Sequence, residues 1–242
     1  MMSPALVFNC HYNGLSIIQE LGRHGVPVYA LDSGRSVGTA SRYAHYWPCP
    51  DPLRDEDAFI RFLIEMGGEF DQKPVLFPTN DHWAAAIARH KLELEKWYLP
   101  CVADGPVVDL LINKDRFYRW AMERNYPVPA LYSAGEVLEG SDDIFPLIGK
   151  PIARRSPNLC TDHQNLVNFL DTHRMIVFNN ASEYRNFASQ YAEYLDHFLF
   201  QEYVPGMADR MYTVGIYANR QHEVLGLFTG RKVRGFPPDI GD

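Results

Sequence analysis

Two short apolar runs with a helical pattern between them constrain the fold of the first part of this chain. Residues 5–8, Ala-Leu-Val-Phe, are apolar throughout, which is typical of a strand buried on both faces of a sheet. The helical pattern of residues 13–24 ends before Gly25, a residue that favours the C-terminus of a helix. A second apolar run follows at residues 28–31 and ends at Asp32. This order predicts a β-α-β unit with parallel strands, and therefore an α/β fold.

The loop after the first strand argues against a dinucleotide site in this unit. The segment Cys-His-Tyr-Asn-Gly, residues 10–14, carries one glycine. A dinucleotide fingerprint needs three, for the tight turn, the approach of the pyrophosphate and the packing of the helix. Asp32 could mimic the acid that binds the ribose, but an acid at the end of a strand is more often a turn residue. An NAD-dependent oxidoreductase is therefore disfavoured, and measuring nicotinamide binding would test this.

Composition narrows the class of protein. The chain has 242 residues, 46% of them hydrophobic, which is enough for one large or two modest domains. A net charge of -7 gives no general basic surface, so no nucleic-acid partner is expected. The four cysteines are widely spaced, without a zinc-site pattern. Residues 1–10 lack a basic start and their apolar run is too short for a signal peptide or a membrane span, so we expect no membrane contact and a cytoplasmic location.

The segment between residues 33 and 90 continues the alternation of strands and helices. A loop rich in Gly, Ser and Pro is expected over residues 33–52, with a short strand at 46–47, followed by a helix at 55–66 and a strand at 75–78. Thr79-Asn80-Asp81 then resembles the start of a helix that runs to about residue 90, since Asn or Asp accepts from free first-turn amides. A substrate-facing role for these polar residues stays open, because ligands of open α/β sheets gather beyond the carboxyl ends of the strands.

Three segments in the second half carry residues suited to nucleotide binding. Lys114, in Ile-Asn-Lys-Asp, opens a helical stretch, where a cation is poorly placed against the helix dipole. Lys150 ends the apolar run of residues 145–151, and a lysine there is costly to bury without an anionic partner. Residues 198–206, Phe-Leu-Phe-Gln-Glu-Tyr-Val-Pro-Gly, form a strand that breaks into a turn. An exposed extended backbone at that break offers carbonyls and amides that can pair with a purine.

These segments resemble, in order and separation, those of the ATP-grasp superfamily, in which a QEY[IV]PG-like segment is the hinge between two lobes and holds adenine. The resemblance implies that Lys114 and Lys150 contact the nucleotide phosphates and that Asp209 accepts from the ribose hydroxyls. It also implies that the carbonyl of Glu202 and the amide of Val204 meet the base. The complete set of nucleotide-binding residues implied in this way is Lys114, Lys150, Gln201, Glu202, Tyr203, Val204 and Asp209.

The segment after Lys150 departs from the family pattern. Many members have a glycine-rich flap there, whereas this chain has Ala-Arg-Arg-Ser-Pro, residues 153–157. Arg154 and Arg155 could replace the flap amides as phosphate partners, or they could belong to a solvated loop, and both alternatives stay open. The run Leu-Phe-Thr-Gly-Arg-Lys-Val-Arg, residues 227–234, is most similar to the carboxylate–amine ligase branch, which includes D-aspartate ligase. That similarity implies that Arg231 and Arg234 hold an acyl phosphate or a substrate carboxylate.

The resemblance covers nearly the whole chain and implies three parts. They are a Rossmann-like N-terminal domain of the pre-ATP-grasp type at residues 1–112, a small nucleotide-binding lobe with a linker helix at 113–200, and the hinge with the first strands of a large lobe at 201–242. The residues themselves predict a helix from Ser182 and Glu183 to about residue 194, and a hairpin from the strand-like runs at 211–218 and 224–228. The carboxylates and Asn that bind Mg²⁺ in the family have no counterpart after Lys232. We therefore expect an incomplete ATP-grasp fold, in a fragment whose Mg²⁺ ligands lie C-terminal to this chain. No metal ligand is assigned within it, and Asp239 and Asp242 are expected to be solvated.

The implied function is that of an ATP-dependent ligase. It would activate a carboxylate as an acyl phosphate for attack by an amine, with ATP and Mg²⁺ as cofactors and a small carboxylate and an amine as substrates. Residues 1–242 alone are expected to be inactive as a ligase. The alternative is a non-catalytic ATP-binding module or sensor. The sequence identifies neither the carboxylate nor the amine, and it leaves open whether the protein is a homodimer.

Overall fold

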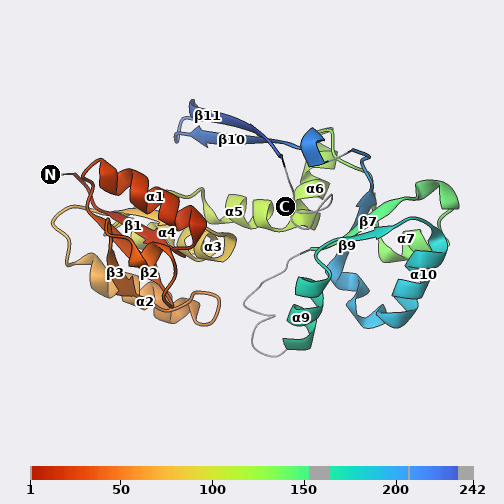
Figure 1. Cartoon of the computed structure of the whole chain (residues 1–242), viewed down its shortest axis with the longest axis horizontal. Helices are drawn as coiled ribbons and strands as arrows, with labels where there is room; N and C mark the ends of the chain where they lie inside the picture. Colours follow the sequence, from red (N-terminus) through yellow and green to blue (C-terminus); the bar gives the residue numbers. More distant parts are fainter. Residues whose placement is uncertain (1, 153–163, 207, 234–242) are drawn as a thin grey trace. The chain divides into compact units, whose positions relative to one another are not determined.

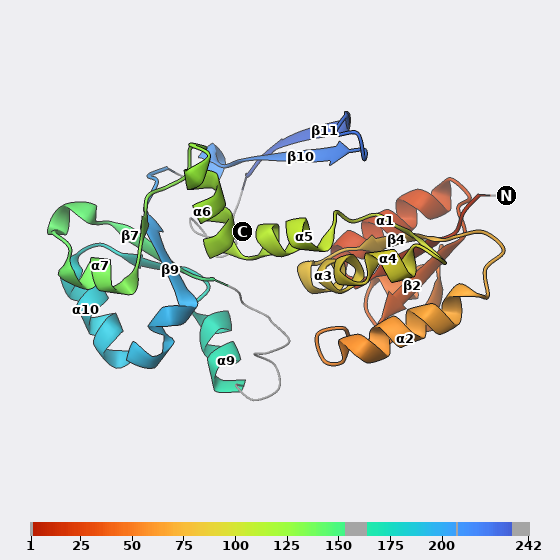
Figure 2. The same ribbon diagram turned by 180° about the vertical axis from the view of Figure 1, so that it is seen from behind.

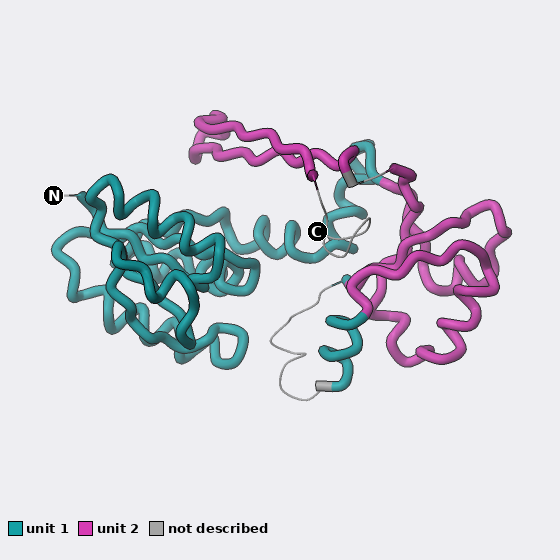
Figure 3. Tube along the Cα trace, viewed as in Figure 1, with its two compact units in different colours: residues 1–128, 152–172 teal, residues 129–151, 173–242 magenta. Residues whose placement is uncertain are grey.

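The structure of this chain is a computed structural model that describes residues 2–152, 164–206 and 208–233. It contains two compact units, coloured separately in Figure 3. The first comprises residues 1–128 and 152–172, and the second comprises residues 129–151 and 173–242. The three-part division predicted from the sequence stays a prediction.

The first unit is built on a five-stranded parallel sheet, drawn in red to yellow in Figure 1. Its strands are β1 (Ala5–Phe8), β2 (Val28–Asp32), β3 (His45–Pro48), β4 (Val75–Pro78) and β5 (Leu99–Pro100). Their order in the sheet is β3-β2-β1-β4-β5, so the chain moves outward in one direction and then returns to the other side of β1. Such a doubly wound order confirms the Rossmann-like α/β fold predicted from the two apolar runs.

Helices cover both faces of this sheet (Figure 2). The helices of the first unit are α1 (Tyr12–Arg23), α2 (Glu56–Gly67), α3 (Asp81–Arg89), α4 (Lys91–Leu94), α5 (Gly105–Ile112), α6 (Lys114–Glu123) and α9 (Gln164–Thr172), with a 3-10 turn η1 (Gly38–Ala40). On one face, Ile18 of α1 packs with Val7 and Ala30. On the other face, α2 and α3 bury Phe59 and Trp83 against Leu6 and its neighbours. The alternation of side chains along each strand therefore supplies two separate cores.

Side chains at the first residues set where several of these helices begin. Asn80 accepts from the amide of Trp83 (3.3 Å), which confirms the predicted capping role at the start of α3. Asp55 caps α2 in the same way through the amide of Ala58 (2.8 Å). Asn113 accepts from the amide of Arg116 (3.0 Å), so it ends α5 and begins α6. Lys114 is therefore the first residue of its own helix.

The second unit contains a four-stranded antiparallel sheet covered on one face by aromatic residues. Its elements are β6 (Leu131–Tyr132), α7 (Ala134–Glu139), η2 (Asp142–Ile144), β7 (Leu147–Pro151), β8 (Ile176–Phe178), α10 (Ala181–Gln190), η3 (Ala192–His197) and β9 (Phe198–Glu202). The strand order is β6-β9-β7-β8. Tyr184 of α10 meets Phe178 and Phe200 edge to face, with ring centroids 5.3 and 5.1 Å apart. These rings join α10 to the central strand β9, which carries the predicted hinge.

The start and end of α10 differ from the sequence prediction. Ser182 and Glu183 were expected to begin a helix reaching about residue 194, but α10 begins at Ala181 and ends at Gln190. The physical reason is that Asn180, and not Ser182, accepts from the amide of Glu183 (3.0 Å). The chain then continues as the 3-10 segment η3 before β9.

A two-stranded hairpin completes the second unit. A 3-10 turn η4 (Ala208–Arg210) precedes β10 (Tyr212–Ala218), which pairs with β11 (Val224–Arg231) as the sequence predicted. One face of this hairpin carries Val214, Ile216 and Leu227, and all three side chains are exposed. Arg231 lies opposite Tyr212 and therefore on the same face.

Candidate functional site

The register of β7 and β9 places two predicted nucleotide-binding residues on one face of the sheet. Lys150 lies opposite Leu199, and Gln201 lies opposite Ile148. Opposed residues of an antiparallel pair share a face, and alternate residues along a strand return to it. Lys150 and Gln201 are therefore diagonal neighbours, about 7–8 Å apart by the usual geometry of such pairs and within reach of long side chains.

Gln201 is buried with its oxygen unpaired. The side chain is 4% exposed, and among the described residues Oε1 has no hydrogen-bond partner. An unsatisfied buried acceptor costs about 1–3 kcal/mol, so Oε1 favours a donor that these residues do not supply. An amino group on a bound base is a donor of the right kind. The burial of Gln201 thus fits the base-lining role that the resemblance implied.

The backbone beyond β9 leaves hydrogen-bonding groups open to a ligand. The amides of Glu202 and Tyr203 donate to the carbonyls of Ala130 (2.9 Å) and Pro146 (3.2 Å). The amide of Ala130 donates to the carboxylate of Glu202 (3.2 Å), and the carbonyl of Glu202 receives no bond from it. Val204 is exposed, and within the described ranges its amide donates to no other backbone group. This edge therefore offers the carbonyl and amide predicted to meet adenine.

The remaining predicted nucleotide contacts belong to other elements of the chain. Lys114 is half-buried in the first turn of α6, in the first unit, whereas Lys150 is in the second. Asp209 is exposed in η4. Tyr203 is half-buried, next to the open backbone edge. The structure places Lys150 beside the hinge strand within the second unit, and the roles of Lys114 and Asp209 stay predictions.

The predicted substrate-binding arginines are only partly described. Arg231 is the last residue of β11 and is exposed, next to Lys232, whose amide donates to the carbonyl of Met211 (2.8 Å). Arg234 lies outside the described residues, as do Arg154 and Arg155 of the predicted flap segment. No catalytic geometry follows for these residues, and their roles stay predictions.

Asp32, at the carboxyl end of β2, has a structural role in the first unit. It is 7% exposed, and its carboxylate accepts from the amides of Cys10 (2.8 Å) and Ser33 (2.9 Å) and from the hydroxyl of Ser36 (3.0 Å). These three donors hold the carboxylate in place at the end of β2, which agrees with the turn role expected for it. Burial, and next the Asp32 charge, raise the pKa of the Cys10 thiol to about 12, which makes this cysteine unreactive at neutral pH.

The described residues do not form a Mg²⁺ site, and Asp239 and Asp242 lie outside them. Among residues 2–152, 164–206 and 208–233, no group of three or more His, Cys, Asp or Glu side chains could hold a metal ion. His90 instead hydrogen-bonds Glu56 (3.2 Å), which also pairs with Arg89. No step that depends on Mg²⁺ is therefore derived for this chain.

Among the described residues, none of the helices has both the length and the apolar character needed to cross a membrane.

Comparison with known proteins yields one curated relative at low identity. The chain is 23% identical to the D-aspartate ligase of Enterococcus faecium (strain Aus0004) over 184 residues, which cover 74% of this chain and 43% of that protein. No family model matches. The chain thus spans less than half the length of this relative.

Solved structures give stronger matches to the fold. An L-amino acid ligase from Bacillus licheniformis superposes with a TM-score of 0.63 at 15% identity, covering 97% of this chain and 52% of that one. The N5-carboxyaminoimidazole synthetase of Staphylococcus aureus, complexed with ADP, gives a TM-score of 0.61 at 13% identity, with coverages of 93% and 53%. These matches confirm the Rossmann-like domain with a partial ATP-grasp fold, and the D-aspartate ligase match agrees with the predicted branch.

Proposed function

We propose that this chain, which has a partial ATP-grasp fold, is the nucleotide-binding part of an ATP-dependent ligase that joins a carboxylate to an amine. The proposal rests on the fold shared with ligases of this kind and on the residues of β7 and β9. A structural neighbour carries ADP. ATP is accordingly the nucleotide proposed for this chain.

The observation that supports the proposal is that Lys150 lies on the same face of the sheet as Gln201, whose buried Oε1 has no partner among the described residues. A cation and a buried acceptor on neighbouring strands suit the two ends of a nucleotide, because the phosphates need positive charge and the adenine amino group needs an acceptor. The open carbonyl of Glu202 and amide of Val204 then supply the remaining contacts of the base edge.

Each proposed residue has one physical task. Lys150, together with Lys114, would offset charge on the phosphates, and Asp209 would accept from the ribose hydroxyls. In the proposed reaction an oxygen of the substrate carboxylate attacks the γ-phosphorus of ATP, ADP leaves, and an acyl phosphate remains. The amine then attacks the acyl carbon and releases phosphate. Arg231 and Arg234 would hold the acyl phosphate or the carboxylate.

Binding of ATP to residues 1–242, measured by calorimetry, tests the first half of the proposal. Lys150→Met should weaken ATP binding at least about tenfold, because a charge-assisted hydrogen bond contributes roughly 1.5–3 kcal/mol. Lys96→Met is the matched control, since this lysine is exposed on the first unit. Equal affinity in both variants would remove Lys150 from the site.

Phosphate release during incubation with ATP and pooled amino acids tests the second half. A ligase releases phosphate only when both a carboxylate and an amine are present, whereas a non-catalytic ATP-binding module binds ATP and releases none. Residues 1–242 are expected to bind without releasing phosphate, and robust turnover by them would contradict that expectation. The same assay on a longer form of the protein, if one exists, decides between ligase and module.

A further inference from the structure

Tyr43 is held firmly against α1 on the first unit. A Cβ atom at Gly22 would lie 2.8 Å from Cγ of Tyr43, so only a glycine allows this approach. The Tyr43 side chain is half-buried against the core formed by Ile18, Val28 and their neighbours. Tyr43 lies two residues before the start of β3, and Arg23 is the last residue of α1. Both therefore lie near the amino-terminal ends of the parallel strands, opposite the carboxyl ends where α/β sheets usually bind ligands.

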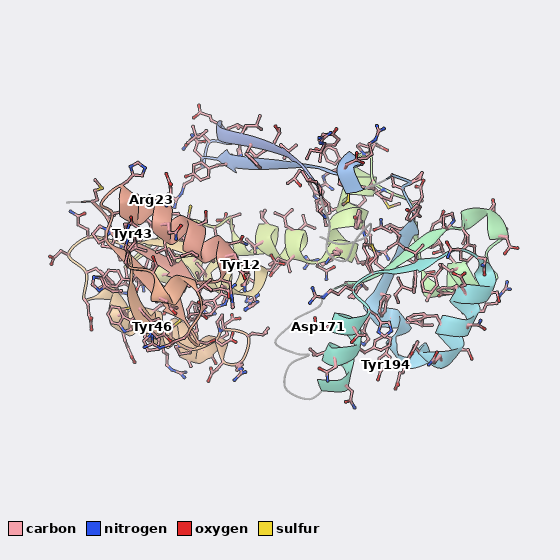
Figure 4. The ribbon with its side chains drawn as sticks, in the orientation of Figure 1. Tyr12, Arg23, Tyr43, Tyr46, Asp171 and Tyr194 are labelled. Carbon is pink, nitrogen blue, oxygen red and sulfur yellow. The ribbon has the colours of Figure 1, made fainter. Side chains whose placement is uncertain are left out.

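Two arginines approach the hydroxyl of Tyr43 from different segments. Nη2 of Arg42 donates to the Tyr43 oxygen at 2.9 Å, and its guanidinium carbon lies 4.9 Å from the ring centroid. Arg23 comes from the end of α1, and Figure 4 labels it next to Tyr43. The hydrogen bond from Arg42, followed by its charge and by the hydrogen bond and charge of Arg23, lowers the pKa of the Tyr43 phenol. The guanidinium groups of Arg23 and Arg42 therefore both act on the uncharged hydroxyl of Tyr43.

Neither arginine is paired with a carboxylate in the described part of the chain. The ion pairs there do not include Arg23 or Arg42, although acidic residues outnumber Lys and Arg by 30 to 23 in the sequence. The nearest acid along α1, Glu20, pairs instead with His24 at 3.2 Å. Both arginines are exposed, so water weakens their mutual repulsion, and their combined positive charge attracts an anion to this surface.

We propose that Arg23, Arg42 and Tyr43 form a binding site for a phosphate group, either inorganic phosphate or a phosphate monoester. The phenol oxygen accepts from the arginines, so its own hydrogen is left to donate outward. The site therefore presents two planar guanidinium forks and one hydroxyl, all donors. Two positive charges match a dianionic phosphate, and donors from three groups suit a tetrahedral oxyanion better than a planar carboxylate.

The test follows the ¹³Cζ resonance of Tyr43 in the full chain labelled at tyrosine, assigned with Tyr43→Phe. Sodium phosphate and methyl phosphate are titrated at constant ionic strength against chloride, and acetate forms a third arm. We expect a saturable shift with one or both phosphates that chloride and acetate do not reproduce. Arg23→Gln and Arg42→Gln should each weaken it about tenfold, since each removes a charge-assisted hydrogen bond.

Arg35→Gln is the matched control, because the guanidinium carbon of Arg35 lies 5.5 Å from the ring centroid of a different tyrosine, Tyr46, in the same unit. This variant should leave the shift of Tyr43 unchanged. Repeating the titration in Lys150→Met separates this site from the proposed nucleotide site. Weakening the nucleotide site should leave the phosphate-induced shift of Tyr43 unchanged. Arg42→Lys keeps the charge and should bind with intermediate affinity, which guards against a folding defect in Arg42→Gln. A shift equal to that in chloride, equal binding of acetate, or unchanged binding in both arginine variants would overturn the proposal.

Discussion

Replacing Gln201 by Met should stabilise the second unit while weakening its binding of ATP. Gln201 is 4% exposed and its Oε1 has no partner in the part of the chain that the structure describes, so nucleotide-free protein carries the cost of a desolvated acceptor. Met has a similar shape without that acceptor. Removing it should raise the free energy of unfolding by about 1–2 kcal/mol, while losing a neutral hydrogen bond to the base should weaken ATP binding by roughly 1 kcal/mol, or about fivefold.

Amide hydrogen exchange in β7 and β9 measures the first effect, and calorimetry with ATP measures the second. The four tryptophans all lie within residues 1–128, so their fluorescence reports on the first unit and should not change. The matched control is Gln190→Met, at the exposed end of α10, where a change within about 0.5 kcal/mol is expected. Lower stability of Gln201→Met, or unchanged ATP affinity, would refute a ligand-directed role for this oxygen.

Three further outcomes follow from contacts in the structure. Lys150→Met should reduce the stabilisation that saturating ATP gives to the second unit, by roughly 1.5–3 kcal/mol, measured from the ATP dependence of exchange in β9. The hydrogen bond from Arg89, then its charge, lowers the pKa of Glu56, so this pair stabilises the fold above pH 4.5, the ordinary value, and is lost below it. The stability gap between wild type and Glu56→Gln should therefore narrow as the pH falls from neutral to acid, in tryptophan-monitored unfolding. Gly22→Ala should destabilise the first unit by about 1–3 kcal/mol through its clash with Tyr43, seen in the same assay.

Local sequence signals were sufficient for most elements of the fold. The apolar runs at residues 5–8 and 28–31 became adjacent parallel strands, because continuous apolar stretches need burial on both faces. Asn80 was recognised as a helix cap because its side chain acts within its own turn. The start of α10 was misplaced since Asn180 and Ser182 are both good caps, and the sequence does not rank them.

The site was harder to predict because it depends on register and burial. Gln201 was assigned to the base pocket from its motif alone, while its unpaired oxygen follows from how β9 sits between β6 and β7. Likewise, the contact of Arg42 with Tyr43 is local, but the approach of Arg23 joins segments twenty residues apart, here 23 and 43. Such contacts have no periodic or motif signal in the sequence.

Photo-crosslinking with an azido-adenine analogue of ATP tests the nucleotide site most directly. If the base lies against the hinge strand, the modified peptides should come from residues 145–151 or 198–206, and excess ATP should abolish the labelling. Labelling confined to the first unit, or labelling that ATP does not compete away, would contradict the proposed site on β7 and β9.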